Sequence, residues 1–186
     1  MRTLSVLLCS LLVASVVLNL LLASKVKSLN ETIEIVKSEQ VLKEGAMVPS
    51  IEANAVDGGA ALIRFDSVSV PTVLYVFTPP CGWCTRNLPA AKALADNIQG
   101  RYRVLGLSLS SDGLEKYVSD SNLSFPVYAD LSSSTRSAYH LGGTPDTIVV
   151  SSDGKVMKHW QGAYVGSTKK EVEAYFNVTL PPVSDQ

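Results

Sequence analysis

Residues Pro71–Thr78, PTVLYVFT, and residues Pro79–Cys84, PPCGWC, decide the fold of this chain. The first stretch is an unbroken apolar run rich in β-branched and aromatic residues, which predicts a strand covered on both faces inside a sheet. The second stretch ends that strand and leads into residues 87–98, where Ala and Leu recur at helical spacing until Gly100. The two cysteines are therefore predicted to lie at a strand-to-helix junction.

Strands and helices alternate on both sides of this junction. Before it, two short strands over residues 50–56 and 60–65 are joined by the turn Asp57-Gly58-Gly59. After it, strands over 102–109 and 126–129 alternate with helices over 112–121 and 132–139, and a hairpin of 146–150 with 156–161 precedes a last helix over 167–176. We expect Asp112 to cap the helix over 112–121, and Ser167 or Thr168 to cap the last one. The alternation predicts an α/β domain with a parallel strand pair over residues 45–178, followed by a tail over 179–186.

The N-terminal segment predicts a membrane anchor. No charged residue occurs from Thr3 to Ser24, and residues 4–23 form a run of 20 mainly apolar residues, long enough to cross a bilayer as a helix. We interpret residues 1–24 as an uncleaved anchor, with a cleaved signal peptide as the alternative. Residues 25–44 are polar and lack Pro and Gly, which predicts a juxtamembrane helix or linker.

Length and charge exclude some classes of function. A chain of 186 residues has room for one domain of ordinary size. Its 16 basic and 17 acidic side chains give a net charge of −1, so there is no basic surplus that would bind nucleic acid.

Cys81-Gly82-Trp83-Cys84 carries the predicted chemistry. Two thiols three positions apart can close a disulfide, and the first lies at the positive end of a helix dipole, which favours its thiolate. We expect Cys81 to attack the disulfide of a partner protein and Cys84 to resolve the mixed disulfide. Gly82 and Trp83 would tune the potential and shape the rim of the site.

A structural zinc site is the alternative use of the two cysteines. Zinc needs four ligands, and the rest of the chain offers Cys9 inside the apolar segment and the isolated His140 and His159. We therefore expect no metal and no cofactor other than a redox-active disulfide between Cys81 and Cys84. His140 and His159 are expected to be ordinary surface or partly buried residues.

The stretch Phe77–Cys84, followed by a helix and later by Gly143-Thr144-Pro145 at the start of a strand, resembles the thioredoxin fold. More narrowly, residues 45–176 resemble the membrane-anchored TlpA/ResA-like thiol-disulfide oxidoreductases. The resemblance implies a central mixed β-sheet flanked by helices, with an added N-terminal β-hairpin around Asp57-Gly58. It also implies that Pro145 is a cis-proline facing the cysteine pair, and that the Thr144 backbone pairs with a substrate strand.

The resemblance also implies a place and a role. The domain would be tethered by a single-pass helix to the inner membrane, on its periplasmic side. It would exchange disulfides with exported proteins as a reductant, for example in cytochrome c maturation, with electrons from a membrane dithiol donor.

Three residues depart from the family pattern. Tyr75 stands where thioredoxins have a buried Asp, Asn87 stands where ResA-like members have Glu, and Pro80 replaces the common Trp before the first cysteine. Pro80 would change the rim and the redox tuning, and the acid that usually moves the proton of Cys84 is missing. We expect Asp112 and Asp130 to be a helix cap and a loop acid rather than proton relays.

Three other functions remain open. Thr78 lies three residues before Cys81, as in the peroxidatic motif of peroxiredoxins, but Leu74 stands where that motif has Pro. A copper-delivery protein of the SCO type would require one more residue between the cysteines. The third is a non-enzymatic docking subunit in which the pair is a permanent structural disulfide.

Overall fold

The protein is described by a computed structural model over residues 12, 15–30 and 41–183. The chain forms two compact units, Met1–Gln40 and Val41–Gln186. In the first unit, residues 15–30 form a helix. No helix among the described residues is both long and apolar enough to cross a membrane.

Part of the N-terminal prediction lies outside the described residues. The positions outside include half of the expected span over residues 4–23, Cys9, and residues 31–40 of the expected linker. The division of the chain into anchor, linker, domain and tail stays a prediction.

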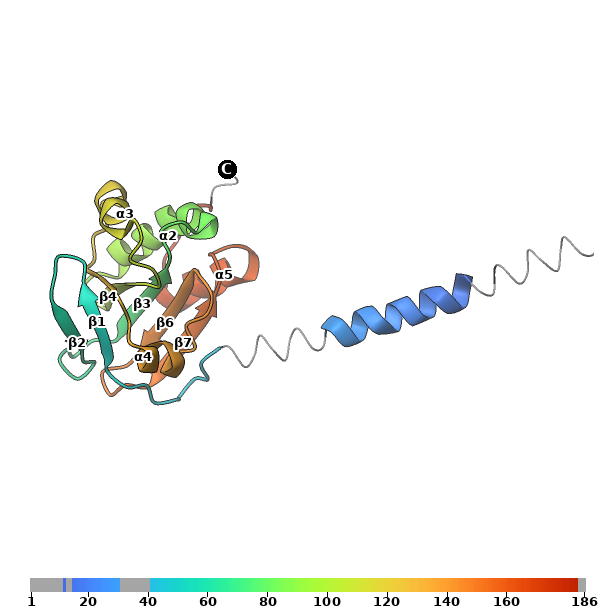
Figure 1. Ribbon diagram of the computed structural model, residues 1–186, viewed down its shortest axis with the longest axis horizontal. Coiled ribbons are helices and arrows are strands. Elements are labelled where there is room, and N and C mark those ends of the chain that lie inside the picture. The colour runs from blue at the N-terminus through green and yellow to red at the C-terminus, as the bar shows by residue number, and fades with distance from the viewer. Residues whose placement is uncertain (1–11, 13–14, 31–40, 184–186) are drawn as a thin grey trace, which may run out of the picture. The chain divides into compact units, whose positions relative to one another are not determined.

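The second unit is built on one mixed sheet (Figure 1). In the described part of the chain the sheet has seven strands, in the order β2-β1-β5-β4-β3-β6-β7. β3, β4 and β5 are parallel, whereas β6 runs antiparallel to β3. The strands are β1 Ile51–Ala55, β2 Ala60–Ile63, β3 Thr72–Phe77, β4 Arg103–Ser108, β5 Val127–Ala129, β6 Asp146–Val150 and β7 Val156–Gln161. The helices of this unit are α2 Gly82–Ile98, α3 Leu114–Ser121, α4 Ser133–Ala138 and α5 Gly166–Phe176.

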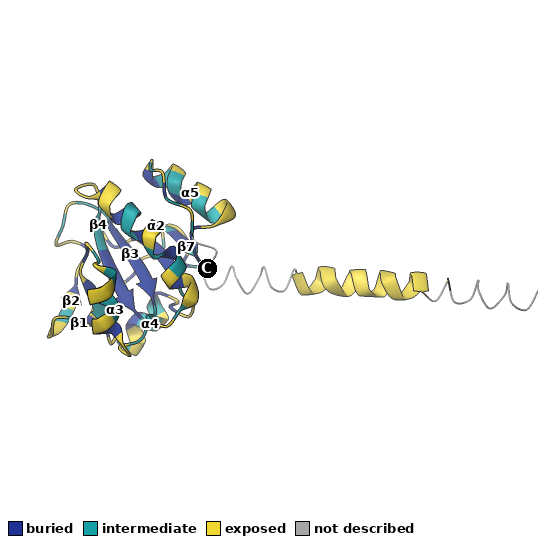
Figure 2. Ribbon diagram, turned by 90° about the horizontal axis from the view of Figure 1, so that it is seen from above, coloured by how far each residue is buried: buried dark blue, intermediate teal, exposed yellow. Residues whose placement is uncertain are grey.

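Strand β3 lies inside the sheet and is buried along its whole length, as its apolar sequence predicted. Its side chains alternate between two cores. Val73, Tyr75 and Phe77 pack with residues of α2, α3 and α5 on one face of the sheet. Leu74 and Val76 pack on the other face with residues beside α4 and with the segment that precedes β1. Figure 2 shows the buried strands between helices whose outer surfaces are exposed.

Gly106 on β4 is tightly surrounded by side chains. A Cβ atom on Gly106 would lie 3.0 Å from Cγ2 of Val127, 3.1 Å from the ring of Phe125 and 3.2 Å from the ring of Phe77. These contacts are shorter than ordinary van der Waals distances, so a side chain at this position would require the neighbouring side chains to shift by a few tenths of an ångström.

The strands and helices predicted for residues 45–178 are all present, but three helix starts differ from the prediction. α2 begins at Gly82, five residues before the expected stripe, so the cysteine motif forms its first turn. Asp112 does not cap α3, because Gly113 takes that position with φ of 65° and no side-chain cap. Ser167 and Thr168 do not cap α5 either, because the helix starts at Gly166 after Val165.

Candidate active site

The cysteine pair lies where the carboxyl end of β3 meets α2. The turn between them is closed by the amide of Cys81, which donates to the Thr78 carbonyl at 3.0 Å. Cys81 is the N-cap of α2, and its Sγ accepts the amide N–H of Cys84 at 3.2 Å. A sulfur in this position faces free amides of the first helical turn, which stabilise negative charge.

The two thiols differ strongly in acidity. Burial opposes ionisation of Cys81, but the hydrogen bonds that its sulfur makes with Cys84 and Thr144 and with the amides of Cys84 and Trp83 together lower its pKa below 9.0. Cys84 is fully buried, and this burial, with the neighbouring Cys81 thiol, raises its pKa to about 12. Both cysteines are free thiols. Cys81 is therefore the sulfur prepared to react first, and Cys84 is held behind it.

The start of β6 faces the pair. The Thr144–Pro145 peptide bond is cis, as the resemblance predicted. The Cys81 thiol donates to the Thr144 carbonyl at 3.6 Å, and the Thr144 hydroxyl donates to the Thr78 hydroxyl at 3.4 Å. The Pro145 carbonyl accepts the amide of Gly162 at 2.7 Å. The fold thus brings Thr144 and Pro145 to the cysteines, although their roles in binding stay predictions.

The other predicted site residues form the rim. Pro80 is exposed in the turn before Cys81. Trp83 is 48% exposed on α2, and the guanidinium carbon of Arg86 lies 3.9 Å from the centre of its ring. Gly82 is the first residue of α2 and is exposed. Their effects on binding and potential likewise stay predictions.

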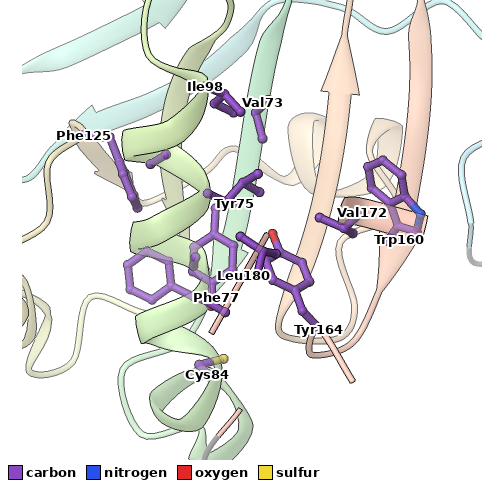
Figure 3. Packing of buried hydrophobic residues seen from close by; sticks show 14 of the residues in the cluster. Val73, Tyr75, Phe77, Cys84, Ile98, Phe125, Trp160, Tyr164, Val172 and Leu180 are labelled. Atoms are coloured by element: carbon purple, nitrogen blue, oxygen red, sulfur yellow. The ribbon is translucent and has the colours of Figure 1, made fainter. Parts of the chain in front are cut away.

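Tyr75 and Asn87, the two departures from the family pattern, are in contact. Both are buried, and the Asn87 amide donates to the Tyr75 hydroxyl at 3.4 Å. Asn87 Oδ1 accepts the amide of Tyr164 at 2.8 Å. Burial raises the pKa of Tyr75 well above its ordinary value, so this phenol stays neutral. Figure 3 shows Cys84 at the end of the same core, beyond Tyr75 and Phe77.

Neither of the acids considered as proton relays is hydrogen-bonded to a cysteine in the described part of the chain. The exposed Asp130 accepts a hydrogen bond from the Asn54 amide at 3.3 Å. Asp112 is exposed in the loop before α3, where its backbone amide donates to Ser110. Neither contact involves a cysteine.

Sequence reasoning missed a buried pair at the start of β6. Asp146, directly after Pro145, lies 3.4 Å from Nε2 of His159, and both side chains are almost fully buried. His159 Nδ1 accepts the amide of Leu42 at 2.8 Å, so the histidine is a core residue that fixes the entry of the chain into the domain. Only the period-2 pattern of β6 and β7, which places these two side chains on one face, could have signalled the pair.

Within the described residues, no group of three or more His, Cys, Asp or Glu side chains is arranged to hold a metal ion. The buried pair of His159 and Asp146 supplies only two such groups.

Comparison with known proteins gives one family and several similar structures. The model of the AhpC/TSA family matches residues 45–159 of the chain. No curated protein matches the sequence. The fold is similar to a putative thiol:disulfide interchange protein DsbE from Chlorobium tepidum, with 19% identity, a TM-score of 0.61, and coverage of 72% of this chain and 94% of that one.

Two further structures extend this comparison. StoA from Bacillus subtilis has 18% identity and a TM-score of 0.54, with coverage of 68% of this chain and 98% of that one. A secreted disulfide oxidoreductase from Mycobacterium tuberculosis has the same identity and TM-score, with coverage of 68% and 93%. At these identities the likeness shows a shared fold, which is the thioredoxin-like sheet and helices described above.

Proposed function

The chain belongs to the AhpC/TSA family, and from that premise we propose that it is a thiol-disulfide oxidoreductase in which Cys81 attacks and Cys84 resolves. One observation carries the proposal: Sγ of Cys81 caps α2 and accepts the Cys84 amide at 3.2 Å, while Cys84 itself is fully buried. This arrangement gives one accessible, acidified sulfur and one sheltered sulfur within reach of it.

The reaction proceeds in two exchanges. The Cys81 thiolate attacks one sulfur of a substrate disulfide, a bond forms between these sulfurs, and the other substrate sulfur leaves as a thiolate. Cys84 then loses its proton to water and attacks Cys81. The second substrate sulfur leaves, and the Cys81–Cys84 disulfide remains. The substrate gains two electrons, and the protein needs no further cofactor or metal.

Proton removal from Cys84 is the demanding step of this scheme. Its pKa of about 12 leaves little thiolate at neutral pH, and the buried neighbours Asn87 and Tyr75 are neutral. Water that enters with the substrate would therefore carry the proton.

We further propose that the domain works as a reductant of exported proteins from a membrane tether. The apolar run over residues 4–23 supports the tether. The similar structures, a putative thiol:disulfide interchange protein and a secreted disulfide oxidoreductase, support disulfide exchange outside the cytoplasm. A role in cytochrome c maturation, with electrons from a membrane dithiol donor and a periplasmic domain, is the specific form of this proposal.

Trapping of mixed disulfides tests the order of the two cysteines. Cys84→Ala should accumulate mixed disulfides through Cys81 when the full chain is incubated with a disulfide-bonded substrate protein. Cys81→Ala should trap none. Equal trapping by both variants would refute the assignment.

The reduction potential of the cysteine pair tests whether the protein works as a reductant or as an oxidant. The full chain is equilibrated with thiol buffers, and the pair is followed by alkylation and mass. A potential of roughly −250 mV or lower supports a reductant, whereas one of roughly −120 to −180 mV indicates an oxidant or isomerase. A pair that does not titrate would favour the docking subunit, and rapid consumption of hydrogen peroxide by the reduced chain would favour a peroxidase.

A further inference from the structure

Arg86 holds a positive charge at the start of α2, beside Trp83 of the cysteine motif. Its guanidinium carbon lies 3.9 Å from the centre of the Trp83 ring, and its Nε donates to the carbonyl of Gly82, the neighbour of Cys81, at 3.4 Å. Stacking on an aromatic ring fixes the plane of a guanidinium and leaves its edge donors free. Because Trp83 is 48% exposed, the guanidinium of Arg86 that stacks on it lies at the rim of the site.

This charge has no acidic partner in the described part of the chain. None of the ion pairs formed there within 4.0 Å involves Arg86. By contrast, Arg64 makes two hydrogen bonds to the carboxylate of Asp66. An ordered guanidinium with unused donors is suited to a carboxylate supplied by another molecule.

The rim around Cys81 also differs in charge from the protein as a whole. Three segments meet there: residues 79–87, residues 142–146 and residues 162–166. They are joined by the bonds from Gly162 to the Pro145 carbonyl and from Tyr164 to Asn87. Arg86 and Asp146 are the charged residues in these segments, and Asp146 is only 1% exposed. The accessible charge of these three segments is therefore positive, although the whole chain has a net charge of −1.

We propose that Arg86 is a specificity residue that favours substrates with an Asp or Glu next to the target cysteine. This proposal rests on the proposed function, because it concerns the disulfide that Cys81 attacks. The substrate backbone lies against Thr144, its apolar atoms contact Trp83, and its carboxylate meets the free edge of the guanidinium. The preferred partner is an acidic, extended segment that carries a disulfide.

The test compares peptides that differ only in charge. Three synthetic peptides carry a single cysteine flanked on both sides by Asp, by Asn or by Lys, and the cysteine is joined to 5-thio-2-nitrobenzoate, whose release is followed by absorbance. The reduced full-length chain is mixed with each peptide, and second-order rate constants are measured. The ratio of the Asp to the Lys peptide cancels any change in the acidity of Cys81, because the same thiolate attacks both.

Arg86→Gln should lower this ratio by about two- to fivefold per contacting carboxylate, the range measured for exposed ion pairs. Arg86→Lys should retain most of the preference, because the charge remains. The control Lys155→Gln removes the same charge from the turn between β6 and β7, where Lys155 pairs with Asp153, and should leave the ratio unchanged. The wild-type preference should also shrink at about 1 M salt, where charges are screened beyond about 3 Å.

An unchanged ratio in Arg86→Gln, or an equal fall in Lys155→Gln, would overturn the assignment of Arg86. Absence of reaction with all three peptides would instead overturn the proposed function. The two failures are therefore distinguishable.

Discussion

Cys81 should be alkylated at least about 50-fold faster than Cys84 near neutral pH. The pKa of Cys84 is raised from 9.0 to about 12, which makes its thiolate about a thousandfold rarer than that of an ordinary thiol. A more basic thiolate is intrinsically more nucleophilic, with a Brønsted coefficient of about 0.4–0.5, and this offsets roughly 20-fold of the difference. The pKa of Cys81 lies below 9.0, so the remaining ratio is a lower bound. Burial of Cys84 slows its reaction further.

The assay uses the reduced full chain with Cys9→Ser, so that the pair provides the only thiols. Iodoacetamide is added in limiting amount, samples are quenched over time, and fragmentation mass spectrometry assigns the modified sulfur. Cys84→Ser and Cys81→Ser, made in the same background, give the rate of each site alone. The rate for Cys81 should reach half its maximum below pH 9.0. Rates within threefold of each other, or faster reaction of Cys84, would refute the reasoning from the helix cap and burial.

Three substitutions test the surrounding fold by urea unfolding. Asn87→Ala removes the acceptor of the buried Tyr164 amide and the donor to Tyr75, and should lower the unfolding free energy by about 2–4 kcal/mol. The control Asn97→Ala, in an exposed position on the same helix, should cost less than 1 kcal/mol by the ~0.5 kcal/mol scale of surface changes. Equal losses in the two variants would contradict the role of Asn87. Burial raises the pKa of Asp146, and His159 opposes this shift. The folded state therefore holds the proton of the Asp146 carboxyl to higher pH than the unfolded chain does. The contribution of Asp146 to stability falls as pH rises from about 4. Asp146→Asn should therefore lose less stability than the wild type between acid and neutral pH, and a steeper loss would count against the argument. Gly106→Ala forces a Cβ to 3.0 Å from Val127 and should cost about 1–3 kcal/mol, whereas a neutral result would show that β4 has room.

The junction of β3 with α2 could be predicted because its signals are local. An unbroken apolar run, a Pro-Pro turn and two cysteines followed by Ala and Leu at helical spacing each depend on neighbours in sequence. The same local reasoning failed at the helix starts. Asp112 is a common cap residue, but Gly113 adopts a left-handed conformation with φ of 65° and starts α3 one position later. Val165, which no capping preference selects, precedes α5.

The polar contacts inside the domain could not be predicted in this way. Tyr75 and Asn87 were recognised as replacements for two acids, yet their mutual hydrogen bond depends on how α2 packs on β3. His159 was expected to be an ordinary surface or partly buried residue, whereas its side chain is fully buried against Asp146. Its second bond, from the Leu42 amide, spans 117 positions of sequence, and no local pattern reports such a contact.

The sheltered position of Cys84 also bears on how long the site survives oxidants. Peroxide that reaches Cys81 would convert it to a sulfenic acid, and further oxidation to sulfinic acid is irreversible for most proteins. Because the side chains of Cys81 and Cys84 are hydrogen-bonded to each other, the second thiol can condense with the sulfenic acid first, releasing water and leaving a disulfide. The product of this oxidation is the same Cys81–Cys84 disulfide that forms in the normal cycle. The electrons that reduce the pair for its next substrate therefore also reverse the damage by peroxide.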